Sequence, residues 1–214
     1  MAKAVVFDLD GTLLDTLPDI VDSVNYTLEK FGAPSRTTKE IRSFIGNGAK
    51  NLIKKSFGNL TEEQLNERLS YYNDLYTNSG SPKTKVFDGV GEVLKTLKMR
   101  GYKIAILTNK PQITTDDVYK TYLNEYNFDK VIGQRDGVKI KPDPTVLLSM
   151  LEEMGVEKSN AYFVGDGDAD VKVALNAGVE SVSALWGYRD KSELEEIGAK
   201  IFIKNPAQLL DIIK

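Results

Sequence analysis

Hydrophobic residues follow two different periods along the chain, and their order predicts an alternation of strands and helices. Short apolar runs, typical of buried strands, occupy residues 5–7, 103–107, 130–133, 161–164, 179–185 and 199–203. Apolar residues at helical spacing occupy residues 90–100, 114–124, 144–155, 169–177, 193–197 and 207–213. Parallel strands joined by right-handed helical crossovers form an open sheet covered by helices. The pattern therefore predicts an α/β fold with a doubly wound, mostly parallel sheet.

Residues 15–81 break this alternation. Their apolar spacing predicts helices over residues 16–32, 38–44, 49–57 and 61–78, and it contains no strand pattern. Thr61 and Gln64 have the spacing of a capping box at the start of the last of these helices. We therefore expect a core domain of residues 1–14 and 82–214, with a small helical cap domain of residues 15–81 inserted into it.

Two carboxylates end the first apolar run. Asp8 and Asp10 follow Val5-Val6-Phe7, and Asp10 is followed by Gly11. The Asp10-Gly11 pair alone could be a simple turn, but this does not account for a charge at Asp8. If the chain stays extended through Leu9, both acids point the same way at the end of a strand, where open sheets bind ligands. A cation would offset their repulsion, and Mg²⁺ prefers such oxygen ligands.

Polar residues also follow the strand at 103–107, and a lysine stands in a later loop. Thr108 and Asn109 could bind a phosphoryl oxygen, or they could cap the next helix with Pro111 in its first turn. Lys141 precedes a segment with two prolines, Pro142-Asp143-Pro144, which restricts the backbone ahead of a helix. A single loop lysine is usually solvated, so Lys141 taken alone predicts little.

A third apolar strand, 161–164, also ends in acidic residues. Asp166, Asp168 and Asp170 have the spacing of the first ligands of a calcium-binding EF-hand loop. That interpretation fails, because Val171 stands where the loop needs glycine and Ala177 where it needs a bidentate glutamate. Asp168 could instead cap the helix that follows.

Composition excludes several kinds of chemistry. The 214 residues include no cysteine and no histidine, which excludes thiol nucleophiles, disulfides, Ser-His-Asp triads and histidine-ligated zinc. A net charge of −3 gives no general attraction to nucleic acid or to an anionic membrane. The chain shows no signal peptide, no membrane-spanning run and no P-loop. We expect a soluble, cytoplasmic protein whose affinity for phosphate is local.

The chemistry-bearing segments together resemble a known family. Phe7-Asp8-Leu9-Asp10-Gly11-Thr12-Leu13 resembles the first motif of the haloacid-dehalogenase-type phosphatases, and Thr108 resembles the second. Lys141-Pro142-Asp143-Pro144 resembles the third motif, and Asp166 with Asp170 resembles the metal-binding motif. The order matches as well, and the resemblance covers nearly the whole chain.

The resemblance implies a mechanism. Asp8 attacks phosphorus and forms an aspartyl-phosphate, while Asp10 protonates the leaving alkoxide and then activates the hydrolytic water. Lys141 balances charge between the nucleophile and the phosphate. The implied Mg²⁺ ligands are Asp8, Asp166 and the backbone carbonyl of Asp10, with Asp170 in a supporting role.

The resemblance also implies a phosphate-binding group and some limits. Thr108, Asn109 and Lys141 hold the remaining phosphoryl oxygens. Family members often have serine at the position of Gly167, so a supporting hydroxyl is missing here.

Substrate specificity is expected to come from the cap, which can close as a lid. In residues 44–50, Gly46 and Gly48 would let backbone N–H groups approach an anionic substrate, with Asn47 or Lys50 assisting. The simpler interpretation is a turn between two helices. This segment, together with residues 15–19 and 185–189, looks most like the phosphoglycolate phosphatase subgroup.

Other functions stay open at this stage. The related pyrophosphatase subgroup has similar motifs, and a phosphosugar mutase resembling β-phosphoglucomutase would use the same acids. A protein of a different class, a phosphate-sensing module without catalysis, is the remaining alternative. The expected partner is a small phosphorylated metabolite, and the expected assembly is a monomer or a homodimer.

Overall fold

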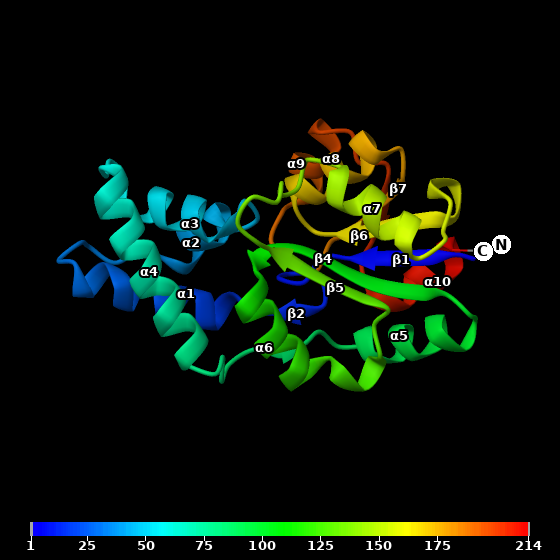
Figure 1. Cartoon of the computed structure of the whole chain (residues 1–214), viewed down its shortest axis with the longest axis horizontal. Helices are drawn as coiled ribbons and strands as arrows, with labels where there is room; N and C mark the ends of the chain where they lie inside the picture. The colour runs from blue at the N-terminus through cyan, green and yellow to red at the C-terminus, as the bar shows by residue number, and fades with distance from the viewer. Residues whose placement is uncertain (1, 214) are drawn as a thin grey trace.

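The computed structural model describes residues 2–213, and a six-stranded sheet runs through its larger part (Figure 1). The strands are, in spatial order, β5 (Lys130–Gln134), β4 (Lys103–Pro111), β1 (Ala4–Phe7), β6 (Ala161–Gly165), β7 (Glu180–Ala184) and β8 (Ile201–Ile203). Every neighbouring pair is parallel. This confirms the predicted α/β fold class.

Helices cover both faces of the sheet because strand side chains alternate between two hydrophobic clusters. In β1, Val5 and Phe7 join one cluster, and Ala4 and Val6 join the other. The first face packs against α5 (Val90–Met99), α6 (Gln112–Tyr122) and α10 (Leu209–Ile212). The second face packs against α7 (Thr145–Glu153) and α8 (Asp168–Ala177). Such burial contributes about 1.5–3 kcal/mol for each large apolar side chain.

The other helical elements around the six-stranded sheet are short. They are α9 (Lys191–Glu196) and three 3₁₀ turns, Asn124–Tyr126, Lys158–Asn160 and Pro206–Gln208. The closing helix is shorter than its apolar pattern predicts, because the last of these turns occupies its first residues. No helix within residues 2–213 has the length and apolar character needed to cross a membrane.

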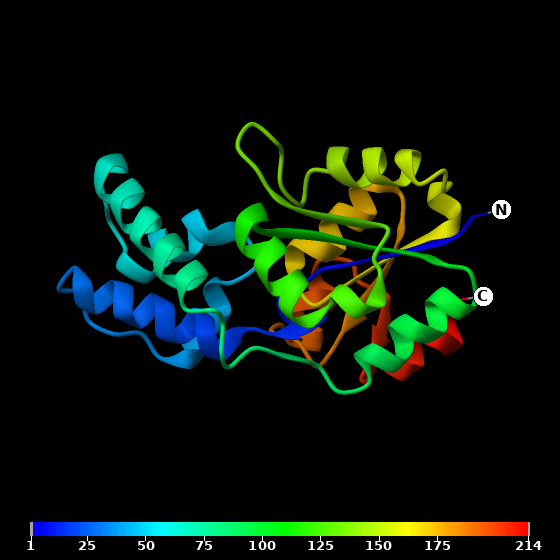
Figure 2. The same cartoon turned by 60° about the horizontal axis from the view of Figure 1, so that its bottom comes forward.

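Four helices form a separate body beyond the carboxyl ends of the strands, opposite the chain termini (Figures 1 and 2). They are α1 (Leu17–Lys30), α2 (Thr38–Phe44), α3 (Gly48–Phe57) and α4 (Glu62–Asn78). We call them the helical segment. It has its own hydrophobic cluster, in which Val24, Leu28, Ile41 and Ile53 are fully buried. The predicted capping box at Thr61 is present at the start of α4.

The helical segment joins the sheet through two strands that the sequence pattern did not predict. β2 (Leu14–Asp15) pairs antiparallel with β3 (Lys85–Val86). The expectation of no strand immediately after residue 14 was therefore wrong, because a two-residue strand is too short to show a period. Nearby, the buried Asp19 carboxylate accepts hydrogen bonds from the backbone N–H of Lys83 and the hydroxyl of Thr84, at 3.1 and 2.7 Å.

β4 continues four residues beyond the predicted strand end. Its last part, Thr108-Asn109-Lys110-Pro111, stays extended after an irregularity in the pairing with β5. Three of these residues are polar yet buried, because the helical segment covers this end of the sheet. One of the two interpretations of this segment placed Pro111 in the first turn of the next helix. Pro111 instead ends the strand, and α6 begins at Gln112.

Candidate active site

The predicted chemistry-bearing residues meet at one edge of the sheet because β1 lies between β4 and β6. Phe7 is in register with Ile106 of β4 and with Val164 of β6. The next residue, Asp8, donates its backbone N–H to the carbonyl of Val164 at 2.9 Å. The segments that carry Thr108 and Asp166 therefore end beside Asp8.

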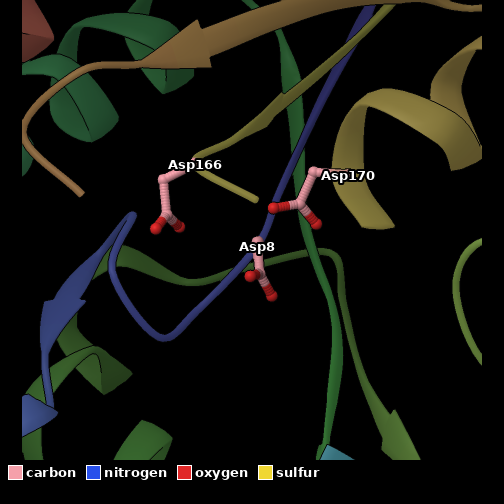
Figure 3. Close-up of side chains that lie close together, drawn as sticks. All are labelled: Asp8, Asp166 and Asp170. Atoms are coloured by element: carbon pink, nitrogen blue, oxygen red, sulfur yellow. The ribbon is translucent and has the colours of Figure 1, made fainter. Parts of the chain in front are cut away.

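Three buried carboxylates surround one space at this edge (Figure 3). An oxygen of each of Asp8, Asp166 and Asp170 lies within 4.8 Å of the others. Burial, followed by the negative charge of Asp170, raises the pKa of Asp8 to about 7. Burial and the charges of Asp170 and Asp8 raise the pKa of Asp166 to about 8. Ionising all three carboxylates together therefore costs free energy unless a cation lies beside them.

Lys141 supplies one positive charge to this group. Its ammonium nitrogen lies 2.7 Å from Asp170 and 2.8 Å from Asp8. Burial alone would lower the pKa of Lys141, but the two carboxylates outweigh it and raise the pKa above its usual value. Asp170 also accepts the backbone N–H of Gly167 at 2.9 Å. Both oxygens of Asp170 thus accept hydrogen bonds from protein groups. This arrangement fits a role for Asp170 in positioning Lys141.

Asp166 is held in position by groups that the sequence did not point to. It accepts the Thr12 hydroxyl at 2.8 Å and the backbone N–H of Tyr188 at 2.7 Å. Gly11 and Gly187 lie so close that a Cβ atom at either residue would overlap the Asp166 side chain. These glycines provide the space that the carboxylate occupies.

The donor set fits a hard divalent cation. Asp8 Oδ1 is buried and makes no hydrogen bond of good geometry, although the Lys141 ammonium is near it. Among the described residues, Asp166 accepts hydrogen bonds from neutral donors and forms no salt bridge. The Lys141 ammonium offsets only one of the three carboxylate charges in this buried space, and carboxylate oxygens are ligands that Mg²⁺ prefers. Asp8 and Asp166 are therefore better placed to bind a metal ion than Asp170.

Asp10 points to a different part of the site. β1 ends at Phe7, so the side-chain alternation assumed for Asp8 and Asp10 does not continue to Asp10. Its carboxylate accepts the Thr16 hydroxyl at 2.7 Å and lies 3.2 Å from the ammonium of Lys110. Among residues 2–213, the acidic group described above does not include Asp10.

A cavity between the sheet and the helical segment contains both Asp8 and Asp10. Thr108 lines it from β4, and Gly46 and Gly48 line it from the helical segment. The Thr108 side chain is buried and accepts the Lys110 backbone N–H at 3.3 Å. A substrate in this cavity would thus contact Asp8, Asp10 and Thr108 together.

Three predicted site residues have other positions or partners. The Asn109 side-chain amide donates to the carbonyls of Gly46 and Lys141, both at 3.0 Å, and its oxygen accepts the Lys141 backbone N–H at 2.9 Å. Its side chain therefore connects two loops, and Asn109 also lines the cavity. Lys50 pairs with Glu62 at the surface, and neither Lys50 nor Asn47 lines the cavity.

Lys110 is the site residue that the sequence analysis missed. Its ammonium nitrogen lies between Asp10 of the sheet and the Tyr76 hydroxyl of α4, 3.0 Å from the latter. Burial alone would lower the pKa of Lys110, but the Asp10 carboxylate and the tyrosine hydroxyls raise it. Lys110 directly follows Thr108-Asn109, which indicates a place near the site. Its partners, Asp10 and Tyr76, are evident only from the fold.

The helical segment is also attached to the loop after β7. Arg42 donates to the carbonyls of Tyr188 and Gly187, at 2.9 and 3.0 Å. In return, Arg189 donates to the carbonyls of Arg42, Ser43 and Ile45, at 3.1, 3.3 and 2.6 Å. These reciprocal bonds hold the helical segment against the sheet.

Comparisons with known proteins identify the family of this chain. The family model of the haloacid dehalogenase-like hydrolases matches residues 5–184. Phosphoglycolate phosphatase 1 of Pseudomonas aeruginosa is 34% identical over 98% of this chain and 79% of its own length. The phosphoglycolate phosphatase of Haemophilus influenzae is 33% identical over 99% of this chain and 98% of its own length.

Solved structures show the same arrangement. A protein of Haemophilus somnus described as a predicted phosphoglycolate phosphatase superposes with a TM-score of 0.92, at 26% identity, over 100% of this chain and 98% of its own. A predicted phosphatase of Clostridium acetobutylicum gives a TM-score of 0.87 at 28% identity, over 100% and 99% of the two chains. Relatives named phosphoglycolate phosphatase are among the proteins that it resembles in sequence, and the chain belongs to the haloacid dehalogenase-like hydrolases.

Proposed function

We propose that this chain is a Mg²⁺-dependent phosphomonoester hydrolase that works through an aspartyl-phosphate on Asp8. The observation that carries the proposal is the placement of Asp8, whose buried carboxylate reaches both the acidic group and the cavity. Named phosphoglycolate phosphatases among its relatives support this activity and suggest a small phosphorylated acid as substrate.

The chain's own groups account for most of the reaction. Asp8 attacks phosphorus, and the bond from phosphorus to the leaving oxygen breaks. Asp10 lies in the same cavity, so it can give a proton to the leaving alkoxide. It can then take a proton from the water that attacks phosphorus, while the bond from phosphorus to Asp8 breaks and inorganic phosphate leaves. Lys141 and the Thr108 hydroxyl neutralise or bind the phosphoryl oxygens, while Asp170 holds Lys141 in place.

Asp8, Asp166 and the backbone carbonyl of Asp10 would hold the Mg²⁺ ion. When bound, the ion offsets the carboxylate charges and withdraws electron density from the phosphoryl group. Thr12 and Tyr188 fix the Asp166 carboxylate, so little rearrangement is needed to receive the ion.

The helical segment would act as a lid that excludes water and selects the substrate. Gly46 and Gly48 bring backbone groups to the cavity, and the arginine bonds described above keep it closed. We therefore assign residues 15–81 to a cap domain and residues 1–14 and 82–214 to the core domain. The smallness of the cavity, about 60 Å³, favours a short substrate over a sugar phosphate.

The test is a phosphate-release screen with phosphoglycolate, pyrophosphate and hexose phosphates, with Mg²⁺ or with EDTA. We expect Mg²⁺-dependent release from phosphoglycolate, and loss of turnover in both Asp8→Asn and Asp10→Asn. Asp10→Asn should still bind Mg²⁺, because its carboxylate is outside the acidic group. Asp74→Asn, an exposed change on α4, is the matched control. Full turnover in Asp8→Asn would refute the proposal.

A further inference from the structure

A buried ammonium group lies in the active-site cavity without a role in the proposed phosphoryl transfer. The Lys110 side chain is 6% exposed, and its nitrogen lies 3.2 and 3.4 Å from the two Asp10 oxygens. Charge-assisted bonds are usually about 2.7–2.9 Å long, so this pairing is loose. The contacts of Lys141, by comparison, are 2.7 and 2.8 Å.

Lys110 has capacity for another acceptor. An ammonium group has three N–H donors. Within residues 2–213, its hydrogen-bond acceptors are the Asp10 carboxylate and the Tyr76 hydroxyl, 3.0 Å away. The nitrogen also lies 4.2 Å from the centre of the Tyr76 ring, which stabilises the positive charge. Because both contacts to Asp10 are long, one of the three N–H groups can turn from Asp10 to an acceptor in the cavity.

The start of α3 adds a second attraction for anions at the same cavity. Gly48 and Ala49, the first two residues of α3, line it, and the side chain of Asn47 does not cap the helix. The first N–H groups of a helix have no partner within the helix, and its dipole favours negative charge there. An ammonium, a hydroxyl and an uncapped helix end thus border one space.

The rest of the cavity limits the size and nature of the ligand. Ile20, Ile45 and Leu52 line it with apolar surface. Its volume is about 60 Å³, and a water-sized group needs about 10–15 Å³ on the same measure, so about four to six such groups fit. The cavity therefore suits a short ligand, and Lys110, which also pairs with Asp10, is a positive group on its wall.

We propose that Lys110 and Tyr76, with the start of α3, bind the carboxylate of a short phosphorylated hydroxy acid whose phosphoryl group lies against Asp8. The inference rests on the proposed hydrolase function and assigns the residues that select its substrate. Lys110 belongs to the sheet and Tyr76 to the helical segment, so the carboxylate bridges the two bodies. Substrate recognition and closure of the cavity are then the same event.

The experiment compares kcat/KM for phosphoglycolate with that for 2-hydroxyethyl phosphate, which lacks the carboxylate, and for pyrophosphate. Lys110→Met should lower kcat/KM for phosphoglycolate about 100-fold, and for 2-hydroxyethyl phosphate less than about 5-fold, because an anion-binding group is lost. Tyr76→Phe, which keeps the ring, should give a selective loss of about 10-fold. Lys54→Met, an exposed change on α3, is the matched control and should change neither value.

Equal losses for the two phosphomonoesters would overturn the proposal, because Lys110 would then serve only Asp10 or the fold. Preference of the wild-type protein for pyrophosphate over phosphoglycolate would also overturn it. If Lys110→Met does not fold, unchanged selectivity in Tyr76→Phe overturns it. A wild-type protein inactive on all three compounds refutes the proposed hydrolase function itself, which separates that failure from failure of the carboxylate assignment.

Discussion

Without a divalent cation, the protein should become less stable as the pH rises from 5 to 8. The pKa values of Asp8 and Asp166 are raised to about 7 and about 8 in the folded state, from an ordinary value of 3.8. The folded protein therefore binds more protons than the unfolded chain in this range. Their stabilising effect is complete below the unfolded value of about 4 and is lost as the pH rises through 7 to 8.

The magnitude follows from the size of the shift. Each pKa unit corresponds to about 1.4 kcal/mol, and a carboxyl with a folded pKa of about 7 gives up about two of these units between pH 5 and 8. The titration of Asp8 alone thus changes the free energy of unfolding by roughly 3 kcal/mol, and Asp166 acts in the same direction. For a chain of this length, that corresponds to roughly 6–12 °C in Tm.

The composition of the chain simplifies the interpretation of this pH dependence. It has no histidine, so few other side chains titrate between pH 5 and 8. Urea unfolding in EDTA should show the loss, and Mg²⁺ should restore stability more at pH 8 than at pH 5. Asp8→Asn, which removes one of the titrating acids, should flatten the EDTA profile.

Constant or rising stability from pH 5 to 8 in EDTA would refute the reasoning. An equal increase in the free energy of unfolding on adding Mg²⁺ at both pH values would refute the proposed competition between protons and the metal ion.

Three further predictions concern the groups around the site. Gly187→Ala places a methyl group against Asp166, so Mg²⁺ affinity by calorimetry should fall about 10–100-fold; unchanged affinity would contradict the described packing. Thr61→Ala removes the cap of α4 and should lower the free energy of unfolding in urea by about 1 kcal/mol, whereas an exposed threonine change should not. Arg189→Ala removes bonds to three carbonyls of the helical segment, and KM should rise several-fold, about the effect of one lost hydrogen bond. A KM equal to that of the wild type would show that these bonds do not control closure.

Much of the fold could be predicted because its elements are long and periodic. The helix predicted over residues 38–44 is present with the same bounds, and the apolar run at 161–164 forms β6. The parallel sheet then determines which strand ends are neighbours, and this explains how Asp8 comes to lie near Asp166. Such inferences need only local pattern and topology.

The parts that were missed depend on single contacts between distant residues. Asn109 lines the cavity, but its side-chain amide also donates to the carbonyls of Gly46 and Lys141, which no local pattern indicates. Lys110 gains its position from Tyr76, on another element. Lys50 was expected at the substrate, but the turn of α3 directs it to the surface. Side-chain direction within a helix depends on packing that sequence spacing alone does not fix.

The pairing of β2 with β3 has a consequence for how this protein can change. Because Leu14 lies directly opposite Val86, the chain leaves and re-enters the sheet region at almost the same point. A stretch of any length between these two residues can therefore be exchanged without stretching the strands that carry Asp8 and Thr108, since closing a longer loop costs little. This topology therefore allows the covering helices to vary independently of the strand ends beneath them.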